Sequence, residues 1–370
     1  MESRMINVAI FNDTNTQTTN HYGCSLVMFN LVCKLKKYNL NPTFFWPVGE
    51  DWRKNKQLIK DRCKFSAIIV NGEGSIHHNT ESDKANYLAE IASYAKSELK
   101  IPAYLINSTI YQNTPRLYDK LRDFEKIYVR ESSTYNSLKD YRIESEIVPD
   151  LTFASDIQGH KIVDEENPYL ITDSTFNNLR SSLQSLSDEI GWEYESMKVK
   201  NEHSLQTFLK RLQKSANKKN FKMFSRFFSF LPKISRYFQS KIEYSNKLYA
   251  TDYKKIVDHD LFIRKIKSKK FVLTGRFHTV TLCIKTGTPF VAIESNTPKI
   301  SSLLYDVFGS SNRLIHESEL ERFGSAFLSK YQKFNNVEIE AIQKYNSEAL
   351  MKIDQMFETI AKHIEDVTKN

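Results

Sequence analysis

The sequence predicts an α/β fold in which two Rossmann-like domains, each built on a parallel sheet, face one another across a cleft. Short apolar runs alternate with longer helix-like stretches, which is the pattern of repeated strand–helix units. With 370 residues the chain exceeds the usual size of a single domain. Hydrophobic residues make up 40% of it, and 10 glycines and 9 prolines are too few for a disordered or fibrous chain. We therefore expect one domain over residues 1–155, a second over 156–335, and a C-terminal helix over 336–370.

The first half of the chain carries the clearest alternation. Runs rich in β-branched and aromatic residues predict strands, and the stretches between them predict helices. Because each strand is followed by a helix, the sheet is expected to be parallel with helices on both faces. The strands are expected at 6–11, 43–46, 67–70, 103–106, 127–129 and 146–148, and the helices at 23–37, 52–63, 82–99, 115–124 and 132–139.

The second half repeats the pattern after an interruption. Residues 151–168 lack the alternation and end in an acidic run and a proline, so we interpret them as a linker. The apolar residues of 337–367 recur with helical spacing, which predicts a long helix that packs across both domains. Between these segments, strands are expected at 169–172, 271–273 and 290–293, and a helix at 279–285.

Much of the net charge of +9 lies in a basic insertion at about 205–245. Between residues 210 and 242 ten lysines and arginines occur without an acidic residue, and large aromatics are interleaved with them. This composition is typical of a segment that contacts an anionic membrane surface, at roughly 1 kcal/mol per cation. Two other interpretations are a solvated pair of basic helices packed on the domain and a single-stranded nucleic-acid site. We expect no nucleic-acid partner, because no RNP, KH or zinc pattern is present.

The remaining features predict a cytoplasmic protein. The N-terminal residues run straight into an apolar strand without a signal-peptide pattern, and no run of about 18 apolar residues could span a bilayer. The four cysteines show no CxxC motif and no Cys/His spacing typical of a metal site, so we expect reduced thiols and no metal. If the basic insertion binds lipid, the protein would work at the inner face of the cell membrane.

Arg276 and His278 form the first candidate site. They follow the predicted strand 271–273, and ligands of open α/β sheets bind at the carboxyl ends of strands. The arginine offers a fixed cation and the histidine a proton donor to an anionic substrate. The alternative is a surface arginine in a salt bridge and a histidine satisfied within a loop, because this pattern alone is a weak signal.

A glycine-containing segment after the third predicted strand forms the second candidate site. Gly72 and Gly74 would let the backbone turn tightly and approach a ligand. Glu73, His77 and His78 would then lie over the strand tip. The segment has neither a GxGxxG fingerprint nor the lysine of a P-loop, so nucleotide binding by those routes is not indicated. The paired histidines lack a third metal ligand with convincing spacing, and they could instead cap helices or face solvent.

Arg130 forms a third candidate at the end of another strand. It stands directly before a helix that Ser132 or Ser133 could cap. It is either a cation at the start of a surface helix or the second arm of an anion clamp.

Several motifs occur in a fixed order: Gly-x-Gly-Ser at 72, Arg-Glu-Ser at 130, Val-Pro-Asp-Leu-Thr-Phe at 148, Gly-Arg-Phe-His at 275, Gly-Thr-Pro-Phe-Val-Ala-Ile at 287 and Asn-Thr-Pro-Lys-Ile at 296. This ordered set resembles the polysaccharide pyruvyl transferases from residue 6 to about residue 310. The resemblance implies a fold similar to that of two-domain GT-B glycosyltransferases. It also implies phosphoenolpyruvate as the donor substrate, with no separate cofactor. The product would be a pyruvate ketal across two hydroxyls of a sugar in a cell-surface polysaccharide or its lipid-linked precursor.

The resemblance also implies roles for individual residues. Arg130, Arg276 and the backbone at Phe277 would hold the phosphate and carboxylate of the donor, with His278 beside the reacting carbon. The glycine-containing segment would contribute Gly74, Ser75 and one of its two histidines, His77 or His78. Glu73 or Asp173 could accept hydroxyl protons. The sequence departs from the family in having Glu73 between the glycines and in carrying the basic insertion.

Two other functions fit the same features. A GT-B glycosyltransferase of capsule or lipopolysaccharide synthesis would bind a nucleotide sugar, with Arg276 on the diphosphate and Glu294 on the ribose. A non-catalytic scaffold of a glycan-assembly membrane would not depend on Arg276 or His278. Fold alone does not decide between these functions.

Overall fold

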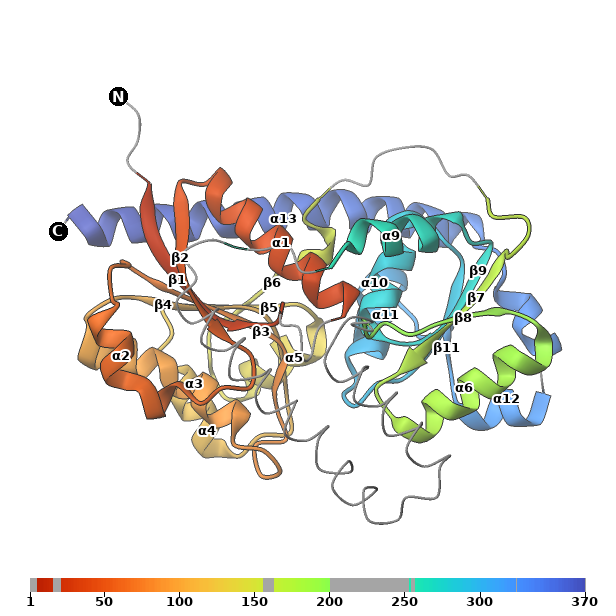
Figure 1. The fold of residues 1–370 in the computed structure, drawn as a ribbon, viewed down its shortest axis with the longest axis horizontal. Coiled ribbons are helices and arrows are strands. Elements are labelled where there is room, and N and C mark those ends of the chain that lie inside the picture. The colour runs from red at the N-terminus through yellow and green to blue at the C-terminus, as the bar shows by residue number, and fades with distance from the viewer. Residues whose placement is uncertain are drawn as a thin grey trace, which may run out of the picture.

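The computed structural model describes residues 5–15, 21–155, 163–199, 253, 257–323 and 325–369. These residues form two parallel sheets, with the N-terminal half on the left of Figure 1 and the C-terminal half on the right. The basic insertion predicted at 205–245 lies outside the described residues, as does part of the predicted linker. The predicted domain limits stay predictions.

The first sheet has the strand order β2-β1-β3-β4-β5-β6, and all of its pairs are parallel. Successive residues of its strands point to opposite faces, so Ile69 belongs to one hydrophobic core while Ile68 and Val70 belong to another. Because both faces are covered, these strands are continuous apolar runs. The strands are β1 (Ile6–Asp13), β2 (Leu40–Pro47), β3 (Ile68–His77), β4 (Ala103–Tyr111), β5 (Lys126–Val129) and β6 (Glu146–Ile147).

Local capping signals set the start of several helices around this sheet. His21 is the N-cap of α1 and accepts a hydrogen bond from the backbone of Cys24, while Pro115 occupies the first turn of α4. The helical segments are α1 (Tyr22–Lys37), η1 (Trp52–Asn55), α2 (Lys56–Asp61), α3 (Lys84–Tyr94), the π-helical turn η2 (Ala95–Leu99), α4 (Pro115–Leu121), α5 (Ser132–Asp140) and η3 (Leu151–Phe153).

The second sheet has the order β11-β10-β9-β7-β8, again with parallel pairs. Three of its helices end at a glycine in the left-handed conformation, Gly191, Gly287 and Gly309. The elements are β7 (Tyr169–Ser174), α6 (Asn177–Ile190), β8 (Glu193–Glu195), α9 (His259–Ser268), β9 (Phe271–Gly275), α10 (Phe277–Thr286), β10 (Phe290–Ile293), α11 (Lys299–Phe308), β11 (Leu314–Ile315), α12 (Glu317–Phe323) and η4 (Ser325–Tyr331).

The C-terminal helix α13 (Asn336–Lys369) runs along both halves of the molecule, as the blue ribbon in Figure 1 shows. It packs against α1 and η3 of the first half and against α10 and α11 of the second. Its buried residues Ile353 and Phe357 belong to the same hydrophobic core as Leu35 of α1 and Val280 of α10. The two halves therefore share one core through this helix. Neither α13 nor any other described helix is long and apolar enough to cross a membrane.

The structure confirms the predicted fold class, but two local predictions are wrong. The glycine-containing segment is not a loop, because β3 continues to His77 by pairing with β4 across an irregularity after Glu73. Gly72 serves this pairing rather than a ligand, since an added Cβ would lie 2.5 Å from the side chain of Ser108. Helix α10 begins at Phe277 rather than at residue 279, which makes Arg276 its N-cap residue.

Candidate active site

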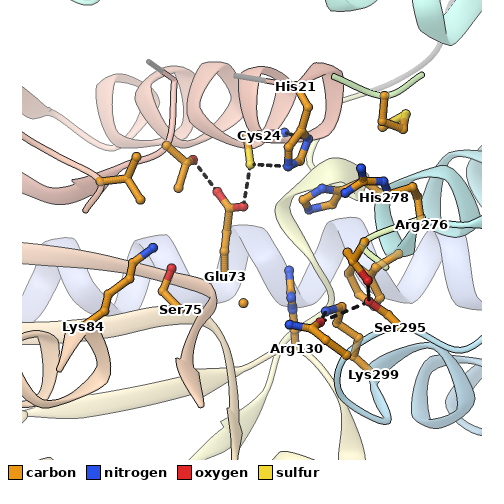
Figure 2. A pocket seen from close by; sticks show the side chains of 17 residues that line it. His21, Cys24, Glu73, Ser75, Lys84, Arg130, Arg276, His278, Ser295 and Lys299 are labelled. Carbon is orange, nitrogen blue, oxygen red and sulfur yellow. Dashed lines mark hydrogen bonds between the residues drawn. The ribbon is translucent and has the colours of Figure 1, made fainter. Parts of the chain in front are cut away.

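A pocket of about 230 Å³ lies between the two halves, and both of them line it. Parallel strands of both sheets end there, as expected for a ligand site of an open α/β fold. Figure 2 shows its side chains converging from α1, from β3 and from the start of α10. The lining residues are Thr14, His21, Cys24, Val48, Glu73, Gly74, Ser75, Lys84 and Arg130 from the first half and Thr175, Met197, Arg276, Phe277, His278, Ser295, Asn296 and Lys299 from the second.

Arg130 is fixed at the end of β5 by groups that also bury it. Its Nε donates to Oγ1 of Thr109 at 2.9 Å, and its Nη1 donates to Oδ2 of Asp150 at 2.8 Å. The centroid of the Phe277 ring lies 4.2 Å from the guanidinium carbon of Arg130, so an aromatic face from the second half covers a cation of the first. Only 2% of Arg130 is exposed, which makes it a rigid donor at the pocket wall.

Arg276 is held by a bidentate ion pair with Asp173. Its Nε and Nη2 each lie 2.8 Å from one oxygen of that carboxylate. Burial opposes ionisation of Asp173, but the hydrogen bonds and charge of Arg276 outweigh it and lower the pKa of Asp173. Asp173 is fully buried and does not line the pocket, so it acts as the counter-ion of Arg276.

His278 occupies the first turn of α10 and faces Asp150. Its Nε2 lies 3.8 Å from Oδ2 of Asp150 and has no hydrogen-bond partner among the described residues. Burial raises the pKa of Asp150, but the neighbouring His278 and Arg130 outweigh this and hold it well below its usual range. Asp150 thus couples a candidate proton donor to Arg130.

Glu73 is the carboxylate that points into the pocket from β3. It accepts hydrogen bonds from Thr14, from Nδ2 of Asn71 at 2.9 Å and from the thiol of Cys24 at 3.0 Å. Its φ angle of 40° lies in the left-handed region, which non-glycine residues rarely adopt. Such strain persists where surrounding structure enforces it and is concentrated at functional sites. Burial, followed by the charge of Glu73, raises the pKa of Cys24, so the thiol stays protonated.

His21, Cys24 and His278 form the one group of described residues with ligand atoms close enough to share a metal ion, within 4.8 Å of one another. Figure 2 shows His21 and Cys24 extending from α1 toward Glu73 and His278. In the structure, hydrogen bonds link His21 to Cys24 and Cys24 to Glu73. Because Nδ1 of His21 accepts from the backbone of Cys24, the proton of the neutral ring is on Nε2, 3.0 Å from Sγ of Cys24. Burial, then the charge of His278, lowers the pKa of His21, which keeps this ring neutral.

Two lysines complete the positive lining. Nζ of Lys299 donates to Oδ1 of Asn296 at 2.7 Å, and Lys84 enters from α3 near Ser75 (Figure 2). Neither ammonium lies within 4 Å of a carboxylate of the described residues. Burial lowers the pKa of Lys84, and burial together with the charge of Arg130 lowers the pKa of Lys299 to about 7. The pocket is therefore built for an anion.

Four of the predicted site residues do not line the pocket. Asp173 pairs with Arg276, as described above. Glu294 accepts hydrogen bonds from the backbone of Ser295, Ile300 and Ser301 and so caps the start of α11. His77, the last residue of β3, and the following His78 lie behind the lining. Nε2 of His77 is 3.3 Å from Nδ2 of Asn296, and Nδ1 of His77 is 2.7 Å from Nδ1 of His78.

A family model described as polysaccharide pyruvyl transferase matches residues 21–297, which is most of the chain. The chain belongs to this family. Membership makes it a transferase, and a sugar polymer and a pyruvyl donor are the substrates that the family description implies. The matched range contains every lining residue between His21 and Asn296, while Thr14 and Lys299 fall just outside it. A comparison with curated proteins found no match.

One solved structure supports the α/β architecture, and two others are similar at lower scores. A putative UDP-N-acetylglucosamine 2-epimerase from Listeria monocytogenes has a TM-score of 0.51 at 8% identity, covering 98% of each chain. At this identity the likeness shows the fold alone. A functionally uncharacterised protein from Klebsiella pneumoniae matches with 12% identity, a TM-score of 0.44 and 84% and 92% of the two chains. The UDP-GlcNAc 2-epimerase of Methanocaldococcus jannaschii, in complex with UDP-GlcNAc and UDP, matches with 11% identity, a TM-score of 0.47 and 93% and 100% coverage.

The structure brings several of the predicted site residues together in one pocket. Glu73, Arg130 and His278, predicted from three separate segments, lie in one pocket together with Gly74, Ser75, Arg276 and Phe277. The sequence analysis did not single out His21, Cys24, Lys84, Asp150 and Lys299. His21 and Cys24 are three positions apart, and the search for metal-binding motifs did not consider this pair. Asp150 and Lys299 were named only as members of longer motifs.

Proposed function

We propose that the protein transfers the pyruvyl group of phosphoenolpyruvate to two hydroxyls of one sugar, forming a ketal and releasing inorganic phosphate. The observation that carries the proposal is the meeting of His278, Glu73 and a set of cations in one pocket between the two halves. Such a pocket offers an acid, a base and anion-binding groups to a small, highly charged donor.

The donor would be held on the side of the pocket where Arg130 and the start of α10 meet. Phosphoenolpyruvate carries a carboxylate and a phosphate, and both bind well to guanidinium groups. The backbone N–H groups of Phe277 and His278 are in the first turn of α10, where no intrahelical acceptor exists and the helix dipole favours an anion. Arg276 adds positive charge there, although Asp173 already holds its Nε and Nη2.

The reaction begins, in this proposal, when His278 gives a proton to the methylene carbon of the donor. The second carbon becomes electrophilic, and a sugar hydroxyl attacks it. The bond between that carbon and the phosphate oxygen then breaks, and its electron pair goes to the phosphate. A second hydroxyl closes the ketal. Two hydroxyl protons are lost in total, which balances one proton gained by the methylene carbon and one carried away by phosphate. Asp150 would stabilise the protonated ring of His278.

Glu73 is the proposed acceptor of the hydroxyl protons. Three hydrogen bonds orient its carboxylate, and its side chain lines the pocket across from the start of α10. A carboxylate has capacity for about four hydrogen bonds, so these three leave room for a sugar hydroxyl. Asp173 is a poorer candidate, because its oxygens are occupied by Arg276, Ser196 and the backbone of Met197.

The acceptor would be a sugar of a cell-surface polysaccharide or of its lipid-linked precursor at the cytoplasmic face of the membrane. The basic segment at 205–245 supports the membrane contact through its charge alone. The test is co-sedimentation with anionic and neutral vesicles, for the protein and for a variant with these lysines and arginines replaced by glutamine. Equal sedimentation of both proteins with anionic vesicles would remove this part of the proposal.

The donor is tested by thermal stability during titration with phosphoenolpyruvate and, separately, with UDP, CMP and GDP sugars. A specific ligand stabilises the folded state by RT ln(1 + [L]/Kd), so the midpoint should rise with phosphoenolpyruvate. His278→Gln should keep this rise and lose release of phosphate with an acceptor present. A rise with one nucleotide sugar instead, with release of its nucleotide, would replace the proposal by glycosyl transfer. Glu294 argues against that outcome, because three backbone N–H groups occupy its carboxylate.

A further inference from the structure

Lys299 differs from the two arginines of the pocket in having no acidic partner within 4 Å among the residues that the structure describes. Arg130 is paired with Asp150 and Arg276 with Asp173, each at 2.8 Å. Only 7% of Lys299 is exposed, and the described residues place no carboxylate within 4 Å of its ammonium. A buried cation without a counter-ion is unfavourable in the free protein. A bound anion would relieve this cost.

The position of Lys299 is fixed by a short chain of polar contacts. Its Nζ donates to Oδ1 of Asn296 at 2.7 Å, and Nδ2 of Asn296 lies 3.3 Å from Nε2 of His77. One of the three N–H donors of the ammonium is thereby used within the described part of the chain. The other two are available to a ligand. His77 does not line the pocket, but it contacts Asn296 from behind the lining.

Lys299 and Arg130 converge on one point of the pocket. A Cβ atom placed on Gly74 would lie 3.7 Å from Nη2 of Arg130 and 3.8 Å from Nζ of Lys299. In Figure 2 the two side chains lie next to each other, whereas Lys84 enters from the other side near Ser75. Two nitrogen donors from different halves of the protein therefore flank the side-chain-free face of Gly74. Phosphate oxygens are well matched to such a pair of cations.

We propose that Lys299, together with Arg130, forms the subsite for the phosphate group of the donor and for the inorganic phosphate that is released. The assignment of the donor rests on the proposed function, but the subsite itself requires only that a phosphate dianion binds. Gly74 belongs to the subsite because any side chain there would occupy the space between the two cations. Lys299 thus determines specificity for a phosphorylated donor, while His278 acts on its carbon.

Phosphate binding should be linked to proton uptake. The charged groups that act on Lys299 are Arg130 and Arg276, which disfavour its protonation, and Glu131 and Glu294, which favour it. The side chain of His77, which acts on it through Asn296, has its pKa lowered to about 4 by burial and is neutral near pH 7. Burial and Arg130 hold the pKa of Lys299 at about 7, and an adjacent dianion would raise it again.

The experiment is calorimetric titration of the free protein with inorganic phosphate at pH 8, in two buffers of different ionisation enthalpy. Lys299→Met should weaken phosphate binding on the order of 10- to 100-fold, the effect of a lost charge-assisted hydrogen bond, and abolish the proton uptake. Lys84→Met is the control, because Lys84 is a half-buried cation of the same pocket with a lowered pKa and lies on the other side, near Ser75. It should change affinity by less than about threefold. Lys299→Arg, which keeps a cation, should retain most of the affinity.

Three results would overturn the subsite: no phosphate binding by the unmodified protein, unchanged binding by Lys299→Met, or equal losses in Lys299→Met and Lys84→Met. Equal losses would mean that the overall field of the pocket attracts the anion. The proposed function fails separately. If phosphate binds through Lys299 but phosphoenolpyruvate is not consumed, the donor assignment is wrong and the subsite stands. If phosphoenolpyruvate is consumed and Lys299→Met leaves its KM unchanged, the subsite is wrong and the function stands.

Discussion

Gly23 of α1 lies directly against the imidazole of His278 from α10. A Cβ atom on Gly23 would approach Cβ, Cγ and Nδ1 of His278 to 2.3 Å, a separation that real Cβ atoms do not show. The ring of His278 therefore depends for its position on the absence of a side chain at Gly23, and its Nε2 faces Asp150 at 3.8 Å.

Gly23→Ala should displace His278 and reduce kcat by about 100-fold, since a misplacement of roughly 1 Å at a reacting group has effects of this size. Alanine is favoured over glycine within a helix, but the added Cβ overlaps Cβ of His278 as well as Cγ and Nδ1 of its ring, so the thermal midpoint should also fall, with an overpacking cost of about 1–3 kcal/mol. The measurement is steady-state kinetics beside a melting curve. Cys33→Ala, on the exposed part of the same helix, is the control and should leave kcat unchanged. Full activity in Gly23→Ala would show that the ring position is not critical.

Asp150→Asn should lower kcat and raise the KM for the donor, because one carboxylate serves both His278 and Arg130. We expect a loss of kcat of at least about 100-fold, the usual contribution of an oriented proton donor. Glu131→Gln is a suitable comparison: this carboxylate is also buried beside Arg130, at 3.5 Å, but does not reach His278. A KM effect in both variants with a kcat effect in Asp150→Asn alone would separate the two roles. Equal kcat losses would contradict them.

Lys299→Met should stabilise the free protein, and more so at low pH. The pKa of Lys299 is about 7 in the folded protein and about 10.4 when unfolded, so between these values the unfolded state binds more protons. The buried charge is thus fully destabilising below pH 7, and its cost fades as the pH rises toward 10. The melting midpoint of Lys299→Met should exceed that of the unmodified protein at pH 6 and approach it at pH 9. Lys344→Met, at an exposed lysine of α13, should show no such trend.

Arg276 and Asp173 should behave as a strongly coupled pair in unfolding experiments. Removing Asp173 leaves Arg276 without this counter-ion, and removing Arg276 leaves Asp173 with Arg180 at 3.6 Å as its remaining cation. Breaking a buried ion pair from one side costs about 3–5 kcal/mol, and the effect of Arg180 should make the loss smaller for Arg276→Ala. Arg276→Ala and Asp173→Ala should each lower the urea midpoint strongly, and the double variant should lose much less than the sum. Additive losses would mean that the bidentate contact contributes little. Because of this coupling, loss of activity in Arg276→Ala alone cannot be assigned to donor binding.

The strands that were easiest to predict are those buried on both faces. Residues 290–293 form β10 with the predicted bounds, since a short run of apolar residues between Gly287 and a polar stretch has few other solutions. The continuation of β3 could not be predicted, because Gly72, Glu73 and Gly74 are poor strand formers. Their conformation depends on pairing with β4, a contact between distant parts of the chain.

The site was predictable where each residue follows a strand and unpredictable where tertiary contacts define it. Arg130, Arg276 and His278 follow β5 and β9, and parallel sheets bring such positions to one edge. His21 and Cys24 instead begin a helix, and they reach His278 only because α1 packs at the boundary between the two halves. Among the described residues no carboxylate lies within 4 Å of the Lys299 ammonium, which is likewise a property of the fold with no signal in the sequence around it.

Because the two halves share one hydrophobic core through α13, we expect them to unfold together. Residues from α1, η3, α10 and α13 belong to one hydrophobic cluster, so neither sheet can lose its packing on that side without exposing apolar surface of the other. Heating should therefore produce a single cooperative transition for the described parts of both halves, and truncation before Asn336 should destabilise the two together. The pocket between the two halves therefore depends on the packing of α13, although α13 contributes no residue to its lining.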